Sequence, residues 1–449
     1  MRTLTTETAN KIGEEVVLQG WVNARRNMGK IVFLDLRDRK GIVQVVGVPQ
    51  ELDEASNELL KDVRPEWVVE IRGIVNARGA KQQNPNMPTG MVEVLAKGIS
   101  ILAKAEPLPL DLEDEKIGLD IHLDFLPITL RAEKYRAVFK IQAEIVRGFR
   151  DYLISQDFTE IQAPKIVAAS AEGGADVFEV KYLKNKATLA QSPQFYKQIM
   201  VGVFERVFAV GNCFRAEQHA TTRHLNEFTG LDLEFGMIKD HHDVMDLEME
   251  MLRHILNHLD ATCVAELKLW NYTRPSVPEK VPYFKLREAQ QIIKDETGVD
   301  HTNEPDLEPS EERFMGEYAK KKFDSDFIFI THYPTSKRPM YTYPDEENPE
   351  FTKSFDLLFR GIEITSGGQR FHDYNELVES MKKKELNPDD FKFYLEAFKY
   401  GMPPEGGLGL GLERLTARLL EIDNVKYATL FPRDMNRIDL QISPPEYKQ

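Results

Sequence analysis

One segment near the C-terminus combines glycines, leucines and an arginine in a pattern that could bind a nucleotide: Gly406-Gly-Leu-Gly-Leu-Gly-Leu-Glu-Arg414. In a strand, alternate residues point to opposite faces, so Gly407, Gly409 and Gly411 leave one face without side chains. Glycine weakens a strand, and three in phase indicate that something flat lies against the backbone. Arg414 falls in the first turn of a following helix, where a cation opposes the helix dipole and suits an external anion. The pattern favours a purine nucleotide over a tightly packed strand with a surface arginine.

A second charged segment, Cys213-Phe-Arg-Ala-Glu217, leads from one expected strand through a polar loop to another. Arg215 and Glu217 alternate, so we expect them to share one face of the first strand. A bidentate arginine suits a phosphate, while the carboxylate could accept a hydrogen bond from an exocyclic amine. Phe228 could cover a base. A cross-strand ion pair on a solvated sheet is the alternative, and it would contribute little.

A third segment places Asp356 and Glu363 on two expected strands separated by Arg360–Gly361. Two carboxylates set in this way could hold Mg²⁺ directly, with phosphates completing the coordination. An acidic face on a hairpin is the competing interpretation. No serine–histidine or cysteine–histidine pair occurs in a recognisable catalytic context. The combination is typical of phosphate chemistry performed by positioning and electrostatics rather than by covalent catalysis.

The N-terminal part of the chain reads as short β segments separated by turn signals, with one helical stretch at Leu52–Lys61. About five such strands predict a small closed barrel of the oligonucleotide-binding (OB) type. The expected strands are Val16–Val22, Ile31–Leu36, Ile42–Val48, Trp67–Val75 and Met91–Leu102.

The pattern of apolar residues changes after a proline-rich, acidic stretch at 105–131. We interpret this stretch as a hinge linker rather than a core element. Val138, Ile141, Ile145 and Phe149 then recur at helical spacing and predict one long amphipathic helix. The remainder mixes helices and strands without a strand–crossover–strand rhythm, which favours an α+β domain on a mostly antiparallel sheet. We therefore expect an OB-fold domain at 1–104, a linker at 105–131 and a catalytic domain at 132–449.

Composition narrows the class of protein. The chain has 449 residues and a formal net charge of −15, which argues against a protein that coats nucleic acid indiscriminately. The N-terminus has no apolar signal core, and no apolar run is long enough to span a bilayer, so we expect a cytoplasmic protein without a membrane partner. Cys213 and Cys263 match neither a zinc spacing nor a disulfide framework, and we expect buried thiols.

Taken together, these segments resemble the three signature motifs of the class II aminoacyl-tRNA synthetases (subclass IIb), over nearly the whole chain. Phe158–Pro164 is similar to the first motif, which builds the dimer interface in the family. The Arg215 and Gly407–Arg414 segments are similar to the second and third. The match is closest to the aspartyl enzymes with an archaeal or eukaryotic type of catalytic domain. It implies an OB-fold barrel joined to a class II catalytic domain, with ATP and Mg²⁺ as cofactors and a homodimer.

The resemblance implies roles for individual residues. Arg215, Glu217 and Arg414 would act in catalysis, and Asp356, Glu363 and Ser366 would hold magnesium. The residues implied for ATP are Arg215, Glu217, Arg223, His224, Leu225, Phe228, Glu363, Gly411 and Arg414. Those implied for aspartate are Glu172, Gln194, Lys197, Arg215, Ser366 and Arg370. Those implied for reading an anticodon are Phe33, Gln44, Arg78 and Glu93, and an aromatic ring such as Phe33 is what an unpaired base requires.

Lys197 and Arg370 place two positive charges where a side-chain carboxylate could be neutralised. Asparagine is neutral and would leave that charge without a partner, so aspartate is favoured. The expected activity is ligation of L-aspartate to tRNA(Asp), with tRNA(Asn) open as a second substrate. The alternatives are an asparaginyl or lysyl enzyme, a synthetase-like RNA-binding paralogue without charging activity, and an enzyme that passes an acyl-adenylate to ammonia.

Overall fold

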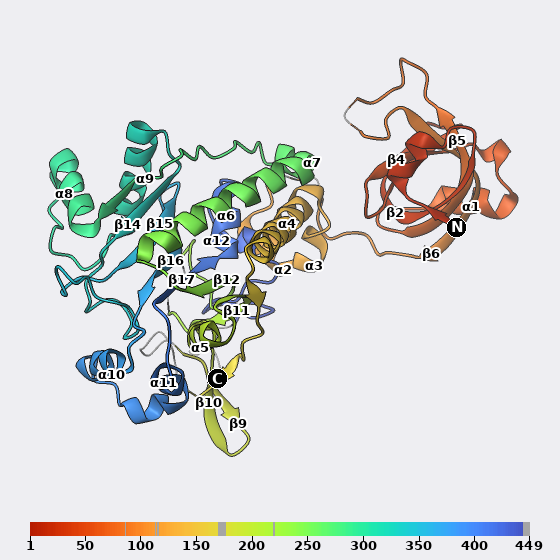
Figure 1. Cartoon of the computed structure of the whole chain (residues 1–449). Helices are drawn as coiled ribbons and strands as arrows, with labels where there is room; N and C mark the ends of the chain where they lie inside the picture. The colour runs from red at the N-terminus through yellow and green to blue at the C-terminus, as the bar shows by residue number, and fades with distance from the viewer. Residues whose placement is uncertain (86, 113, 115, 169–176, 219–220, 443–449) are drawn as a thin grey trace, which may run out of the picture. The chain divides into compact units, whose positions relative to one another are not determined.

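The computed structural model describes residues 1–85, 87–112, 114, 116–168, 177–218 and 221–442, and it contains two compact units, Met1–Asp111 and Leu112–Gln449 (Figure 1). The division falls inside the stretch expected to be a linker. The second half of that stretch is helical, forming α2 (Leu119–Asp124) and α3 (Leu126–Thr129). Leu123 and Leu126 are buried there, so the expectation of a hinge is wrong for these residues.

The first unit is a closed barrel. Its six-stranded sheet has the order β1-β2-β3-β4-β6-β5, and an additional pairing of β2 with β5 closes it. Burial alternates along β2, with Val16, Leu18 and Val22 inside, because successive side chains of a strand point to opposite faces. The strands are β1 (Arg2–Thr3), β2 (Glu15–Asn27), β3 (Val32–Arg37), β4 (Ile42–Gly47), β5 (Val68–Ala77) and β6 (Val92–Ala103), with α1 (Glu54–Asp62) between β4 and β5. The predicted OB-type barrel is confirmed.

The second unit is built on an eight-stranded sheet that is antiparallel except where β13 pairs with β14 and β7 with β11. In spatial order the strands are β13 (Tyr283–Lys285), β14 (Phe327–Thr331), β15 (Ser354–Phe359), β16 (Ile362–Arg370), β17 (Glu405–Gly411), β12 (Glu227–Gly236), β11 (Arg206–Phe214) and β7 (Thr159–Glu160). A separate small sheet contains β8 (Ile166–Val167), β10 (Asn185–Leu189) and β9 (Glu179–Tyr182). The predicted α+β class is confirmed.

Helices cover this sheet. Figure 1 shows α4 (Glu133–Ser155), α6 (His241–Thr262) and α12 (Leu412–Leu419) lying together; α4 contacts both α6 and α12, and α6 and α12 contact the central strands β16 and β17. The helix predicted from Val138, Ile141, Ile145 and Phe149 is α4, and all four residues are buried in the core. The remaining helices are α5 (Gln194–Phe204), α7 (Val264–Leu269), α8 (Leu286–Thr297), α9 (Pro309–Phe323), α10 (Tyr374–Lys383) and α11 (Lys392–Lys399). Among the described residues, no helix is both long and apolar enough to cross a membrane.

His122 of α2 is expected to make the stability of the second unit depend on pH. Its ring packs 4.2 Å from the Tyr135 ring centroid, and burial lowers its pKa to about 4. The folded state disfavours the charged imidazole, so protonation of His122 favours unfolding. The free energy of unfolding therefore has its full value above the ordinary pKa of about 6.5 and decreases as the pH falls toward 4. We expect the urea midpoint of the second unit to fall between pH 7 and pH 5, and His122→Gln to reduce that fall.

The matched control is His258→Gln, which removes a histidine from the far end of α6 where its imidazole lies 2.6 Å from Glu144. Urea titrations of the three proteins at both pH values provide the comparison. Identical pH dependence in wild type and His122→Gln would show that His122 does not carry the effect.

Candidate functional site

Two arginines from distant segments face one cleft. Arg215 directly follows β11 and Arg414 lies in the first turn of α12, and both line a cavity of about 90 Å³. β12 brings them together because it pairs with β11 on one side and β17 on the other, with Gly230 opposite both Gly211 and Gly411. The residues expected for ATP all line this cavity: Arg215, Glu217, Arg223, His224, Leu225, Phe228, Glu363, Gly411 and Arg414.

Arg215 and Glu217 lie beyond the end of β11, so the expectation that they share a face of that strand is wrong. Asn226 fixes the backbone of this segment by hydrogen bonds instead. The backbone N–H of Arg215 donates to the Asn226 carbonyl at 2.9 Å, and Asn226 Nδ2 donates to the carbonyls of Arg215 at 2.7 Å and Glu217 at 3.1 Å. The Arg215 guanidinium lies 5.3 Å from the centre of the Phe228 ring, within the range of a cation–π contact.

Arg414 anchors the other end of the cleft. Its Nη1 lies 3.5 Å from the Glu363 carboxylate and donates to the Glu363 carbonyl at 3.2 Å. Burial alone would raise the pKa of Glu363, but the neighbouring cations Arg414, Arg338 and Arg223 outweigh burial and lower it. Glu363 therefore carries a negative charge among arginines, which keeps these cations close together before any phosphate arrives.

Arg223 is held by Glu312 of α9, a residue that sequence reasoning missed. Arg223 Nη2 donates to both Glu312 oxygens, at 2.8 and 3.0 Å, and Glu312 Oε2 also accepts from the Glu363 backbone N–H at 3.1 Å. Burial raises the pKa of Glu312, although Arg223 opposes the shift. Glu312 thus positions Arg223 beside Glu363, and an incoming phosphate would compete with it for the guanidinium. The sequence did not indicate this role, because an acidic residue in the first turn of a charged helix is common without such a contact.

The glycines of β17 have two uses, of which the sequence predicted one. Gly409 and Gly411 line the cleft, as expected for a floor without side chains. Gly407 lies opposite Glu234 of β12, and a Cβ atom there would come within 2.2 Å of the Glu234 carboxylate. The glycine at this position makes room for the buried Glu234 side chain and not for the base of a nucleotide. The expectation of three glycines under the nucleotide is therefore wrong at Gly407.

A second cavity of about 310 Å³ adjoins the first, sharing Arg215, Phe228, Glu363, Ser366, Gly409 and Gly411 with it. Gln194, Lys197 and Arg370, all expected to bind aspartate, line this second cavity and are buried. Glu172 lies outside the described residues.

Lys197 and Arg370, the two cations expected to bind aspartate, are already paired. Lys197 Nζ lies 3.1 Å from Asp232 and 3.2 Å from Glu234 and donates to the Leu408 carbonyl at 2.8 Å. Arg370 Nε donates to Glu234 at 2.8 Å; burial alone would lower the pKa of Arg370, but this carboxylate outweighs burial and raises it. A substrate carboxylate therefore meets a network in overall charge balance rather than two free cations. Asp232 and Glu234 alternate along an apolar strand, and that signal was present in the sequence.

Asp356, expected to hold magnesium, is buried and bonded to a second residue that sequence reasoning missed. Arg338 Nη2 lies 2.7 Å from its carboxylate, and Arg338 Nη1 donates to Ser366 Oγ at 3.0 Å. Burial raises the pKa of Asp356, and Glu363 adds to the shift while Arg338 opposes it. Asp356 Oδ1 is buried without a hydrogen-bond partner among the described residues. An unpaired carboxylate oxygen near Glu363 is compatible with a hard cation such as Mg²⁺.

Three of the four residues expected to read an anticodon form one cluster on the barrel. Gln44 Nε2 donates to Glu93 at 3.1 Å, and Arg78 Nη2 donates to Gln44 Oε1 at 3.2 Å. Arg26, which was not assigned to this set, also reaches Gln44 Oε1 at 3.4 Å. Phe33 is half-buried and pairs with Arg26 across β2 and β3. The barrel therefore presents an aromatic ring near a group of polar and basic side chains.

Comparison with known proteins agrees with this geometry. The family described as tRNA synthetases class II (D, K and N) matches residues 119–435, and the OB-fold nucleic acid binding domain matches residues 16–102. The chain is 48% identical to the aspartate–tRNA(Asp/Asn) ligase of Thermus thermophilus, over 98% of this chain and 100% of that protein. It is 45% identical to the ligase of the same name from Deinococcus radiodurans, over 97% and 98%.

A solved structure shares the whole fold. The asparaginyl-tRNA synthetase of Pyrococcus horikoshii, complexed with asparaginyl-adenylate, superposes with a TM-score of 0.89 at 29% identity. The match covers 98% of this chain and 99% of that one. The chain belongs to the class II tRNA synthetases of the aspartate, lysine and asparagine group.

Proposed function

We propose that this protein is an ATP-dependent aspartate–tRNA ligase, which activates L-aspartate and transfers it to the 3′ end of tRNA. The observation that carries the proposal is the junction of two cavities. A cleft lined by Arg215 and Arg414 adjoins a pocket lined by Lys197 and Arg370, and the two share six lining residues. The names of the relatives from Thermus and Deinococcus support aspartate as the amino acid.

In the first step, an oxygen of the aspartate α-carboxylate attacks the α-phosphorus of ATP, and the bond to the β-phosphate oxygen breaks, releasing pyrophosphate. We assign Arg215 to the α-phosphate and Arg414 to the outer phosphates, where they stabilise charge that develops in the transition state. Phe228 stacks on the adenine and Glu217 accepts from its amine. In the second step, the terminal ribose hydroxyl of tRNA attacks the aspartyl carbonyl and AMP leaves.

Magnesium, when bound, supplies positive charge to the phosphates. Asp356, Glu363 and Ser366 are the residues that would hold it, and the unpaired Asp356 Oδ1 supports this assignment. Arg338 touches the carboxylate of Asp356 and the hydroxyl of Ser366, so it fixes the orientation of both. We assign Arg338 a positioning role.

Amino-acid selection follows from the paired network around Lys197. An asparagine side chain would bring an amide in place of the carboxylate that Lys197 and Arg370 can share. The mismatch leaves buried donors facing donors, which is costly. The test is ATP–pyrophosphate exchange with each amino acid in turn. We expect exchange with aspartate and little with asparagine or lysine; exchange that is fastest with asparagine would overturn the assignment.

The side chains clustered on the barrel indicate how the protein would recognise its tRNA. We propose that Phe33, Gln44, Arg78 and Glu93 read the anticodon of tRNA(Asp), and that tRNA(Asn) is also charged, as the names of the two relatives indicate for those proteins. Charging purified tRNA(Asp) and tRNA(Asn) side by side with labelled aspartate tests this. Charging of tRNA(Asp) alone would restrict the proposal to a single tRNA.

Phe33→Ala separates anticodon reading from chemistry. Loss of stacking on one base costs about 1–3 kcal/mol, so we expect kcat/KM for tRNA to fall about 5–150-fold. The exchange reaction, which needs no tRNA, stays unchanged. Trp21→Ala, which removes an exposed aromatic ring of the same barrel, is the matched control. An equal loss in both variants, or a loss of exchange in Phe33→Ala, would contradict the assignment.

We also propose a homodimer. The segment similar to the first motif is flanked by Ile154 and Ile166, which are 58% and 51% exposed in the single chain. Large apolar side chains at such exposure suit a protein interface better than solvent. Sedimentation of the full chain tests this, and a monomer at micromolar concentration would contradict it.

A further inference from the structure

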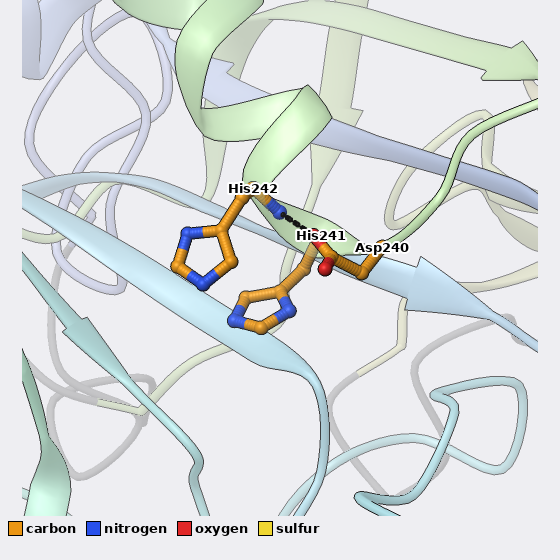
Figure 2. A group of neighbouring side chains, drawn as sticks. All are labelled: Asp240, His241 and His242. Carbon is orange, nitrogen blue, oxygen red and sulfur yellow. Dashed lines mark hydrogen bonds between the residues drawn. The ribbon is translucent and has the colours of Figure 1, made fainter.

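Three metal-ligating side chains gather at the start of α6. Asp240, His241 and His242 each present a ligand atom, and these atoms all lie within 4.8 Å of one another. Figure 2 shows the two imidazole rings side by side, with the Asp240 carboxylate on the other side of His241. Asp240 Oδ1 caps the helix by accepting from the His242 backbone N–H at 2.8 Å, which fixes the carboxylate beside the rings. None of the three residues lines the ATP cleft or the amino-acid pocket.

His241 is the unusual member of this group. It is 3% exposed, and within the described part of the chain neither of its ring nitrogens has a hydrogen-bond partner. A buried polar group without a partner is costly, and such groups in native proteins call for an explanation. An imidazole nitrogen that makes no hydrogen bond can offer its lone pair to a metal ion.

A third histidine approaches from another element. His332 directly follows β14, and its ring centroid lies 5.3 Å from that of His241, while the centroids of His241 and His242 are 4.3 Å apart. Two imidazoles on one tetrahedral zinc ion place their ring centres about 5 Å apart, given Zn–N distances of about 2.0–2.1 Å. The two observed spacings, 4.3 and 5.3 Å, are therefore close to the spacing that two imidazoles on one ion require.

One nitrogen of His332 has an outer contact in place. Its Nδ1 lies 2.9 Å from Thr331 Oγ1, which leaves Nε2, 3.7 Å from the Asp345 carboxylate and beyond hydrogen-bond distance, as the nitrogen for the metal. A metal-binding histidine is normally oriented by a hydrogen bond at its other nitrogen. The backbone of His332 is left-handed, with φ of 59°, a conformation that is strained for a residue other than glycine and that clusters at functional sites.

We propose that Asp240, His241, His242 and His332 form a binding site for a borderline divalent metal ion such as Zn²⁺, which clips the start of α6 to the end of β14. Imidazole and carboxylate ligands without thiolate suit zinc, cobalt or nickel. The site is structural, because it lies outside the cavities of the proposed reaction. Lys285 and Lys353 lie near His241, and the helix dipole also opposes a cation here. The carboxylates of Asp240 and Asp345 offset that charge.

Zinc titration of the full-length protein tests the proposal. The titration uses a chromophoric zinc chelator as competitor and excess Mg²⁺ to occupy oxygen-rich sites. We expect a single tight zinc ion per chain, a zinc-dependent rise in Tm, and with Co²⁺ a visible spectrum of tetrahedral nitrogen and oxygen ligation without a thiolate band. No tight zinc ion, or a cobalt spectrum with thiolate bands, would overturn the proposal.

Three variants locate the ion while preserving the local fold. Asp240→Asn keeps a helix-capping side chain, and His332→Asn keeps a residue that tolerates a left-handed backbone. His242→Gln removes a half-buried ring. Loss of a ligand is expected to weaken zinc affinity at least about 10–100-fold, the range seen for outer contacts alone. His258→Gln, at the other end of α6, is the control that keeps wild-type affinity. Wild-type affinity in all three ligand variants would place the ion elsewhere and overturn the proposal, while the exchange activity tests the proposed function separately.

Discussion

Arg215→Ala is expected to abolish aspartate-dependent ATP–pyrophosphate exchange while leaving the fold intact. Arg215 stands where the two cavities join, so its guanidinium can reach both the attacking carboxylate and the α-phosphate. Removal of a single charge-stabilising donor costs about 10²–10³ in rate, and an arginine acting on a transferred phosphoryl group is worth about 10³–10⁵. We therefore expect a loss of at least about 10³-fold in exchange, with Tm changed little because the side chain lines a cleft.

Arg147→Ala is the matched control, since Arg147 is an exposed arginine of α4 that pairs with its helical neighbours Glu144 and Asp151. Exchange in that variant should equal wild type. Exchange by Arg215→Ala within about tenfold of wild type would remove Arg215 from the reaction, since that is well short of the smallest expected effect.

Lys197→Met is expected to damage both stability and activity. Lys197 is 1% exposed and pairs with Asp232 and Glu234, so its removal leaves these two buried carboxylates without the cation that they share. Breaking a buried ion pair by removing one partner costs about 3–5 kcal/mol. We expect the free energy of unfolding to fall by about that amount, and the exchange with aspartate to be lost.

The double variant Lys197→Met/Asp232→Asn separates the two effects. Neutralising Asp232 removes one of the stranded charges, so urea titration should show part of the stability recovered. Exchange should stay absent, because the cation that faces the substrate carboxylate is still missing. Recovery of exchange together with stability would mean that Lys197 acts only on the fold and not on aspartate.

Much of this architecture could be predicted from sequence because it depends on local patterns. Alternating burial gave the barrel strands, and helical spacing gave α4. The cleft could be predicted because its residues occur in three compact segments, and Arg215 and Arg414 do meet there. The error at Gly407 has a physical origin. A glycine opposite a bulky acid and a glycine under a ligand look the same along one strand, and only the pairing with Glu234 distinguishes them.

The missed residues share a different property, which is that their role depends on long-range pairing. Glu312 reaches Arg223 from α9, and Arg338 reaches Asp356 from a loop between β14 and β15. No spacing rule links residues so far apart in sequence. The helices α2 and α3 were missed because Pro127 and the surrounding acids indicated a linker, although a proline is tolerated in the first turn of a helix.

The most direct test of the account is a crystal structure with a non-hydrolysable aspartyl-adenylate analogue. We predict that the group replacing the phosphate lies within hydrogen-bond distance of the Arg215 guanidinium, with the adenine against Phe228 and the aspartyl carboxylate beside Lys197 and Arg370. An analogue bound with its aspartyl group away from Lys197, or with no contact to Arg215, would contradict the central claim that one continuous cavity joins the nucleotide to the amino acid.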